Sequence, residues 1–274
     1  MIITDKFVLL NFPKTGSTYV RKVIRDIYDQ RAANNYLYKI ALKLGIREPY
    51  YKELILPNIK FKKGIVNHSD QHGIYSQIPQ KDKNKKIISV IRNPYTRFIS
   101  GYEFKFWQQR PALDQKLLKE NFSNFPNLSI DEYVDYVILV ANHSFFNNKN
   151  NLKIGSMSLQ FIQFFFKDPN KVIEKLKENY LSSNTLYLND MADIRFLQQE
   201  NLNVELAAFL KEEGFKNKEI DYALKHKEIN VTNNKERNKN LYYTSKVINY
   251  IEEYESFYLK ALINKGIVYS KPAD

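Results

Sequence analysis

The chain has 274 residues, of which 43% are hydrophobic and 26% charged; this composition supports a sizeable buried core and excludes an intrinsically disordered protein. The difference between 42 Lys and Arg and 30 Asp and Glu gives a net charge of +12, which favours anionic partners: nucleic acid, a membrane surface or a phosphorylated small molecule. The absence of cysteine excludes a disulfide framework, a thiol nucleophile and cysteine-ligated metal sites.

The chain opens with a predicted strand, turn and helix. The segment Phe7–Asn11 is short, apolar and followed by Phe12-Pro13, as is typical of a buried strand. Apolar residues then recur on one helical face, at Val20, Val23, Ile24 and Ile27. A tight turn containing Gly16 is therefore expected to join a buried strand to an amphipathic helix.

Two further strand and helix units are predicted downstream. The second strand, Ile87–Ile91, is followed by Arg92-Asn93-Pro94, where Asn93 is expected to cap a helix and Pro94 to be its first residue. The third, Thr185–Leu188, precedes a helix at Val204–Lys211 that ends at Gly214. This alternation predicts an α/β fold in three layers with a central, mainly parallel sheet, whose ligands bind at the carboxyl ends of the strands.

The remaining predicted elements are helices. They are expected at Ser129–Val140, at Ser158–Phe166, at Pro169–Lys177 with Asp168 as cap, and at Ser245–Asn264 with Gly266 after its end. The roughly ninety residues between the second and third strands are too many for a simple crossover. We therefore expect a single domain over 1–274, with a helical insertion around 104–184 that shapes the ligand cleft.

The turn after the first strand has the properties of an anion site. A helix N-terminus presents unpaired backbone amides and the positive end of the helix dipole. Gly16 allows close approach of the backbone, Ser17 and Thr18 add hydroxyl donors, and Lys14 adds a full positive charge. Because Lys14 precedes Gly16 and no earlier glycine exists, the segment is not a Walker A loop, which disfavours use of ATP or GTP through that motif.

Two motifs together resemble those of the sulfotransferases that use 3′-phosphoadenosine-5′-phosphosulfate (PAPS). Phe12–Tyr19 resembles the 5′-phosphosulfate loop of that family, and Arg92–Tyr102 is similar to its 3′-phosphate motif, an arginine at a strand end with a serine eight positions later. The resemblance implies that the 5′ end of the nucleotide is bound by Lys14, Thr15, Gly16, Ser17 and Thr18. It implies that Arg92 and Ser100 bind the 3′-phosphate.

Sulfuryl transfer to a hydroxyl needs a base for the acceptor proton. The chain has four histidines, and in carbohydrate-type sulfotransferases a histidine placed similarly to His68 is the base, so the resemblance implies that His68 has this role. His72 is the alternative, and Glu103 a more remote carboxylate candidate. We interpret His143 as a surface residue and His226, between two lysines, as solvated.

The C-terminal part resembles the closing segment of carbohydrate-type sulfotransferases, in which a basic loop folds over the nucleotide. Here the loop 233–239 contains Lys235 and Arg237, whose simpler interpretation is a solvated charge run. The resemblance points to a carbohydrate hydroxyl as acceptor, with the helical insertion forming the acceptor side. Phe104, Phe106 and Trp107 could stack on a sugar ring, although their spacing favours the core.

The resemblance thus implies a PAPS-dependent sulfotransferase that needs no metal: His68 takes the acceptor proton and Lys14 neutralises the leaving 5′-phosphate. Two other classes stay open, a nucleotide kinase with a degenerate loop and a basic nucleic-acid-binding module. No apolar stretch reaches the ~18 residues of a spanning helix. We therefore expect a soluble, cytoplasmic protein without a transmembrane segment or a bound nucleic acid.

Overall fold

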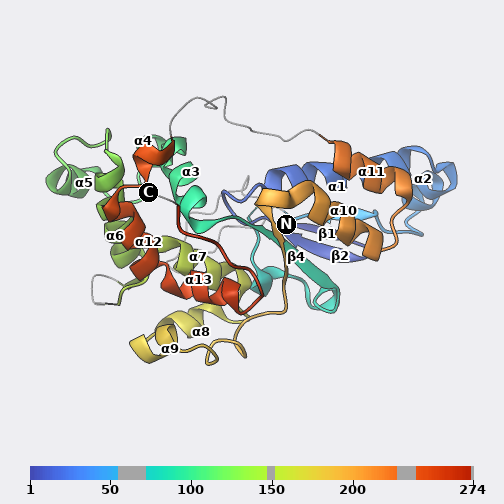
Figure 1. Ribbon diagram of the computed structural model, residues 1–274. Helices are drawn as coiled ribbons and strands as arrows, with labels where there is room; N and C mark the ends of the chain where they lie inside the picture. Colours follow the sequence, from blue (N-terminus) through green and yellow to red (C-terminus); the bar gives the residue numbers. More distant parts are fainter. Residues whose placement is uncertain (55–71, 147–151, 227–238, 273–274) are drawn as a thin grey trace. The chain divides into compact units, whose positions relative to one another are not determined.

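The computed structural model describes residues 1–54, 72–146, 152–226 and 239–272 (Figure 1). These residues form two compact units. The first unit consists of 1–54, 72–92 and 193–226, and the second of 93–146, 152–192 and 239–272. Within the described residues, every strand of the sheet belongs to the first unit, while the second unit is built mainly of helices.

The first unit contains a five-stranded mixed sheet in the order β3-β1-β2-β4-β5. Its strands are β1 (Ile2–Thr4), β2 (Phe7–Leu10), β3 (Tyr51–Glu53), β4 (Lys86–Ile91) and β5 (Arg195–Gln198). Strand β4 is parallel to both β2 and β5, whereas β1 is antiparallel to β2 and β3. The prediction of a mainly parallel sheet is therefore wrong at one edge, because the two-residue turn between β1 and β2 permits only antiparallel pairing.

Helices pack on one face of this sheet through the side chains that alternate along its strands. The helices of the first unit are α1 (Ser17–Ala33), α2 (Tyr36–Lys43), α10 (Leu202–Glu212) and α11 (Asn217–Lys225). Phe7 of β2 lies edge-on against Phe209 of α10, with ring centroids 5.0 Å apart. The predicted apolar stripe of α1 is confirmed, since its members are all buried in the same core cluster: Val20, Val23, Ile24 and Ile27. The three-layer arrangement stays a prediction.

The third predicted strand lies elsewhere. Residues 185–188 form a turn, and the strand that joins the sheet is β5 (Arg195–Gln198). The Ser183 hydroxyl oxygen accepts hydrogen bonds from the amides of Thr185 and Leu186, both at 3.1 Å. Such a local side-chain bond competes with strand pairing, and Leu186 is half-exposed. A short apolar run was therefore insufficient evidence for a buried strand.

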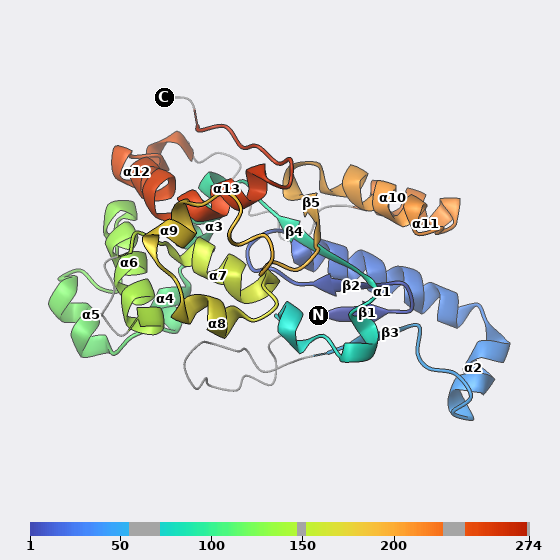
Figure 2. The same ribbon diagram turned by 90° about the horizontal axis from the view of Figure 1, so that it is seen from below.

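The second unit is helical (Figure 2). Its helices are α3 (Pro94–Phe104), α4 (Phe106–Gln109), α5 (Gln115–Asn121), α6 (Ile130–Phe146), α7 (Ser156–Phe165), α8 (Pro169–Glu174), α9 (Glu178–Ser182), α12 (Ser245–Tyr254) and α13 (Ser256–Ile263).

Short 3₁₀ turns occur in the first unit at Tyr75–Gln77, Gln80–Asp82 and Gln199–Asn201, and in the second unit at Lys239–Tyr242. Among the described residues, no helix is long and apolar enough to cross a membrane.

Several helix ends follow the predicted capping chemistry. The Asn93 side chain accepts a hydrogen bond from the Tyr95 amide at 2.9 Å, and Pro94 is the first residue of α3, as predicted. Asp168 caps α8 through the Lys171 amide at 3.1 Å. Gly214 follows α10 with φ 69°, the left-handed conformation that glycine adopts at low cost. These local predictions are confirmed.

The predicted helix Ser245–Asn264 is instead two helices, because Glu255 interrupts it. Glu255 is fully buried, and its carboxylate accepts hydrogen bonds from the Ser158 amide at 2.7 Å, the Ser158 hydroxyl at 2.8 Å and the Tyr250 hydroxyl at 2.8 Å. A further bond comes from the Met157 amide at 3.0 Å. Burial raises the pKa of this carboxyl, which these donors oppose. Glu255 thus caps the N-terminus of α7 from the break between α12 and α13.

Gly155, next to this carboxylate, is the position where a small substitution should destabilise the fold most clearly. A methyl group there would overlap the Glu255 carboxylate and approach the Tyr250 hydroxyl to 2.6 Å. We expect Gly155→Ala to lower the free energy of unfolding by about 2–4 kcal/mol, through overpacking and loss of buried hydrogen bonds. Urea denaturation measures this change.

Gly101→Ala is the matched control, because its methyl group would meet only the Tyr133 hydroxyl, at 3.1 Å, and alanine favours the helix. Equal stability of the Gly155→Ala variant and the wild-type chain would contradict the role assigned to Glu255.

Candidate active site

The loop between β2 and α1 has an unusual backbone. Strand β2 is completely buried, α1 begins at Ser17, and two residues between them adopt left-handed conformations, Lys14 with φ 63° and Gly16 with φ 89°. Positive φ is rare for a residue other than glycine, and it persists where the surrounding structure holds it. This backbone turns sharply just before the N-terminus of a 17-residue helix, where amides can bind an anion.

Hydroxyl groups inside the loop hold its shape. The Thr15 hydroxyl donates to the Phe12 carbonyl oxygen at 2.8 Å, and the Ser17 hydroxyl donates to the same oxygen at 3.0 Å. Both residues are buried, whereas Thr18 is exposed. The sequence predicts that the Ser17 hydroxyl donates to a ligand, but in the structure it donates to the Phe12 carbonyl oxygen within the loop. Thr15 and Ser17 can therefore bind an anion through their backbone amides.

Gly16 is required both for its conformation and for space. Its φ of 89° is strained for any residue with a side chain. A methyl group there would also meet Gln199 Cγ at 3.1 Å and Leu202 Cδ2 at 3.4 Å. The start of α10 thus packs directly against the loop, a contact that no sequence pattern indicated.

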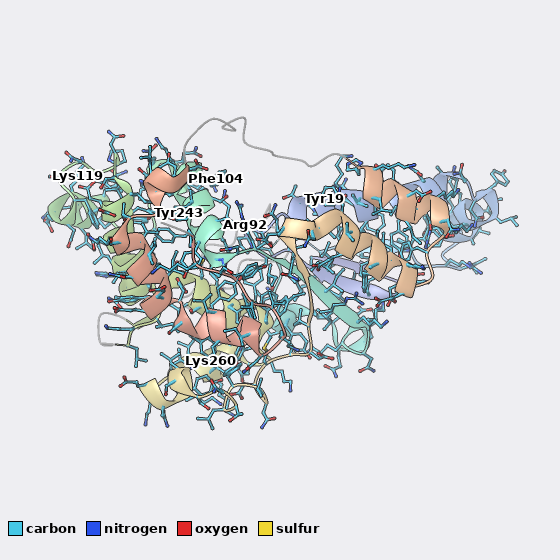
Figure 3. All side chains as sticks on the ribbon, viewed as in Figure 1. Tyr19, Arg92, Phe104, Lys119, Tyr243 and Lys260 are labelled. Carbon is cyan, nitrogen blue, oxygen red and sulfur yellow. The ribbon has the colours of Figure 1, made fainter. Side chains whose placement is uncertain are left out.

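Lys14 and Arg92 come together because the strands that precede them are parallel neighbours. Leu10 of β2 pairs with Ser89 of β4, and the Ser89 hydroxyl donates to the Leu10 carbonyl oxygen at 2.8 Å. Arg92 follows the end of β4 (Figure 3). Lys14 is half-buried, and this burial together with the positive charge of Arg92 lowers its pKa to about 8. Two cations are thus close enough at this edge of the sheet to disfavour each other's charge.

His72 is held at the same edge. Its Nδ1 lies 2.7 Å from the carbonyl oxygen of Asn11, the residue that follows β2. Because a carbonyl oxygen can only accept, Nδ1 must carry a proton in this contact, and Nε2 is then the basic nitrogen of the neutral ring. From the sequence, His72 is the alternative base. Its contact with Asn11 could not be predicted there, because the two residues are 61 positions apart. His68 lies outside the described residues.

The other candidate bases lie on other elements of the chain. His143 is on α6 of the second unit. His226 packs against the rings of Tyr19 and Tyr222, at centroid distances of 5.8 and 5.0 Å, so the expectation of a solvated His226 is wrong. Glu103 is on α3, and within the described chain its Oε1 is buried without a hydrogen-bond partner. No cluster of His, Asp and Glu suited to a metal ion occurs among the described residues.

The second predicted phosphate motif is divided between the two units. Arg92 is the last residue of the second segment of the first unit, and Ser100 lies half-buried on α3 of the second unit. Arg97, between them, is fully buried and donates from Nη2 to Gln160 Oε1 at 2.7 Å. Burial lowers the pKa of its guanidinium. Arg97 therefore has a packing role within the second unit. Lys235 and Arg237 lie outside the described residues.

Two aromatic residues that the spacing assigned to the core are exposed. The rings of Phe104 (labelled in Figure 3) and Phe106 stack with centroids 5.9 Å apart and an interplanar angle of 13°, and about half of each side chain faces solvent. Trp107 is buried, as the spacing predicted, and its indole N–H donates to the Pro126 carbonyl oxygen at 3.0 Å. The core prediction is thus correct for Trp107 and wrong for the two phenylalanines.

Comparison with known proteins gives one finding. A family model described as a sulfotransferase domain matches residues 4–266, which includes both units and every candidate residue named above. Searches of the curated proteins and of the solved structures give no match.

Proposed function

The chain belongs to the sulfotransferase family, and from that membership we propose that it transfers the sulfuryl group of PAPS to a hydroxyl group, on a carbohydrate or glycoconjugate. The observation that supports the proposal is the proximity of two cations, Lys14 and Arg92, which follow the parallel strands β2 and β4 beside a helix N-terminus. Each of two neighbouring cations disfavours the protonated, charged form of the other, and a multiply charged anion bound between them offsets this repulsion. PAPS has phosphate groups at both ends of its ribose.

The loop supports binding of the 5′ end of the donor. Gly16 allows close approach of the backbone, and the amides at the N-terminus of α1 are donors that can bind the phosphosulfate. Lys14 supplies the charge that compensates the leaving 5′-phosphate, and the amides of Thr15 to Thr18 hold the sulfuryl oxygens. Arg92 and Ser100 contact the 3′-phosphate, as the resemblance implies. No step in this arrangement needs a metal ion.

The reaction is an in-line displacement at sulfur. The acceptor oxygen forms a bond to sulfur while the bond between sulfur and the 5′-phosphate oxygen breaks, and the acceptor proton passes to a base. His68 is our candidate for this base from the resemblance. His72 is the second candidate, because the Asn11 carbonyl orients its ring with Nε2 as the basic nitrogen. The products are the sulfated acceptor and adenosine 3′,5′-bisphosphate.

The exposed pair Phe104 and Phe106 supports a carbohydrate acceptor. Flat aromatic faces that remain exposed in a folded chain can stack on the apolar face of a sugar ring. The pair follows directly from α3, the helix that carries Ser100. A screen of carbohydrate and phenolic hydroxyl acceptors with labelled PAPS, followed by mass spectrometry, tests both donor and acceptor. Sulfation of phenols alone would overturn the carbohydrate assignment.

Arg92→Ala should remove selectivity for the 3′-phosphate. We expect calorimetry to show that the wild-type chain prefers adenosine 3′,5′-bisphosphate over adenosine 5′-monophosphate by about 10–150-fold, because a charge-assisted bond to phosphate contributes about 1.5–3 kcal/mol. The variant should bind both nucleotides with similar affinity.

Arg110→Ala, at an exposed arginine of the second unit, is the matched control. If Arg92→Ala kept the full preference, Arg92 would have no role at the 3′-phosphate. Magnesium-dependent binding of ATP in place of PAPS would favour the kinase alternative, and salt-steep binding of DNA without PAPS would favour the nucleic-acid-binding module.

A further inference from the structure

Helix α2 (Tyr36–Lys43) exposes an unusual number of large apolar side chains. The exposed fractions are 75% for Tyr36, 78% for Leu37, 67% for Leu44 and 71% for Ile46, with Ile40 at 38%. Single exposed apolar residues are common, but a contiguous group of them marks an interaction surface. The helix lies beyond the C-terminal end of α1 within the first unit (Figures 1 and 2).

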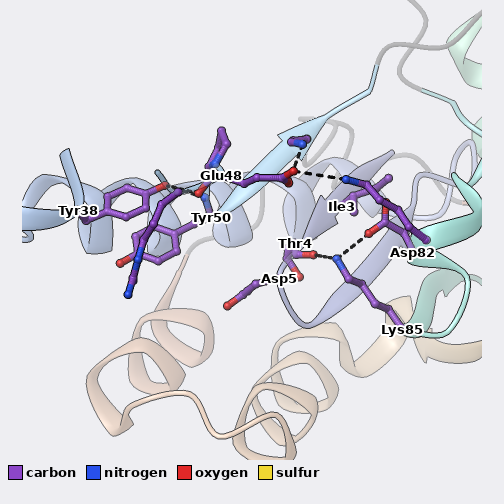
Figure 4. A pocket seen from close by; sticks show the side chains of 12 residues that line it. Ile3, Thr4, Asp5, Tyr38, Glu48, Tyr50, Asp82 and Lys85 are labelled. Carbon is purple, nitrogen blue, oxygen red and sulfur yellow. Dashed lines mark hydrogen bonds and ion pairs between the residues drawn. The ribbon is translucent and has the colours of Figure 1, made fainter. Parts of the chain in front are cut away.

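Four of the exposed residues form one stripe, opposite the side that holds the helix to the fold, whereas Leu42, 38% exposed, and Ile46, after the end of the helix, lie outside it. At about 100° per residue, Tyr36, Ile40, Leu44 and Leu37 span an arc of only about 100°. Tyr38 projects on the other side, where it is buried and stacks on Tyr50 at 3.9 Å between ring centroids (Figure 4). Its hydroxyl also accepts a hydrogen bond from the Tyr50 amide at 2.8 Å. The outer stripe is therefore not needed to anchor α2.

The charges beside this stripe are all positive. Lys39, Lys43 and Arg47 are exposed, and the segment 34–47 contains no Asp or Glu. Within the described chain none of these three cations forms an ion pair, and Lys39 donates to the Ala33 carbonyl oxygen at 2.9 Å. The next acidic residue, Glu48, is paired with Lys52 and Lys81 (Figure 4).

We propose that this α2 face, formed by Tyr36, Leu37, Ile40, Leu44, Lys39 and Lys43, binds peripherally to an anionic lipid surface. An apolar stripe flanked by lysine and arginine is the composition of an interfacial helix, in which the apolar side chains enter the headgroup boundary and the cations contact anionic headgroups. In a symmetric dimer formed through this face, the same cations of the two copies would lie opposite one another. Their repulsion disfavours a second copy of the chain as the partner. The proposal goes beyond the catalytic function and does not depend on it.

Flotation of the full chain with vesicles tests the proposal. We expect the protein to float with phosphatidylcholine vesicles that contain phosphatidylserine, and to stay unbound with pure phosphatidylcholine vesicles. The charge-reversing pair Lys39→Glu and Lys43→Glu, and separately the pair Leu37→Ser and Leu44→Ser, should each weaken binding by about tenfold or more. The changed side chains are exposed, so the thermal unfolding midpoint should stay that of the wild-type chain.

Matched controls lie on other helices of the same unit. Lys218→Glu with Lys225→Glu changes the net charge equally on α11, and Val204→Ser on α10 with Leu224→Ser on α11 removes apolar groups that are 63% and 42% exposed. Both controls should float like the wild-type chain. Equal losses in controls and α2 variants would show attraction by net charge alone and overturn the proposal, as would failure of the wild-type chain to float. A concentration-dependent dimer that Leu37→Ser with Leu44→Ser dissociates, without vesicle binding, would make the face a contact between copies.

Discussion

Lys14→Met is expected to lower kcat by about 10²–10³-fold, because it removes the positive charge proposed to stabilise the leaving 5′-phosphate. Steady-state rates with PAPS and the acceptor found in the screen measure this loss. Lys22→Met is the matched control, since Lys22 is exposed on α1 and, among the residues that the structure describes, forms its ion pair with Asp26, four residues later. Loss of less than about threefold in the Lys14 variant would remove Lys14 from the reaction.

The lowered pKa of Lys14 makes a second measurement possible. In the free protein the lysine loses its proton near pH 8, whereas a bound 5′-phosphate would stabilise the protonated form and raise its pKa. Binding must therefore take up a proton above pH 8, and the affinity for adenosine 3′,5′-bisphosphate should fall as pH rises from 8, by up to about tenfold per unit. Below pH 7 the lysine is charged in both states, and its contribution should be constant.

Lys14→Arg separates this effect from other titrations. An arginine stays protonated throughout the range, so its binding curve should be flat between pH 7 and about 10. Calorimetry in two buffers of different ionisation enthalpy counts the protons taken up. A wild-type curve that is as flat as that of the arginine variant would contradict the assignment of Lys14 to the phosphate.

His68→Ala is expected to lower kcat by about 10²–10⁴-fold while the affinity for adenosine 3′,5′-bisphosphate stays unchanged, because a general base acts on the acceptor and not on the nucleotide. The affinity measurement is needed because a variant with a disturbed fold would lose both turnover and nucleotide affinity. His143→Ala, on α6 of the second unit, is the control for the loss of a histidine.

His72→Ala tests the alternative directly. If Nε2 of His72 is the base, this variant shows the large loss and His68→Ala keeps nearly normal turnover. His72→Gln should not rescue the rate, although glutamine can still donate to the Asn11 carbonyl oxygen that orients the ring. Near-normal rates in both alanine variants would exclude His68 and His72 as the base and direct attention to Glu103.

Local signals in the sequence were sufficient to predict the elements around the loop between β2 and α1. The buried strand β2, the amphipathic helix α1 and the cap of α3 depend on residues within a few positions of one another. The two motifs predicted to bind phosphate also depend on local sequence, since each consists of a strand end and the helix that follows. Their resemblance to sulfotransferases agrees with the family match over residues 4–266. Composition by itself excluded only thiol chemistry and disorder.

Longer-range features were decided by the tertiary structure. The antiparallel edge of the sheet depends on pairing of β1 with β3, some fifty residues apart, and the break at Glu255 depends on the N-terminus of α7, about a hundred residues earlier. Periodicity describes one segment at a time, so neither partner was visible in it. Exposure of Phe104 and Phe106 likewise depends on what packs around α3.

The same distinction holds at the candidate site. The sequence by itself determined which residues could bind an anion, because lysine, arginine and a glycine turn have that chemistry wherever they lie. Only the tertiary structure decided that parallel pairing of β2 with β4 places Arg92 near Lys14, and that His72 donates to the Asn11 carbonyl. The pKa of Lys14 is a property of that arrangement, since burial and a neighbouring charge arise only when distant parts of the chain pack together.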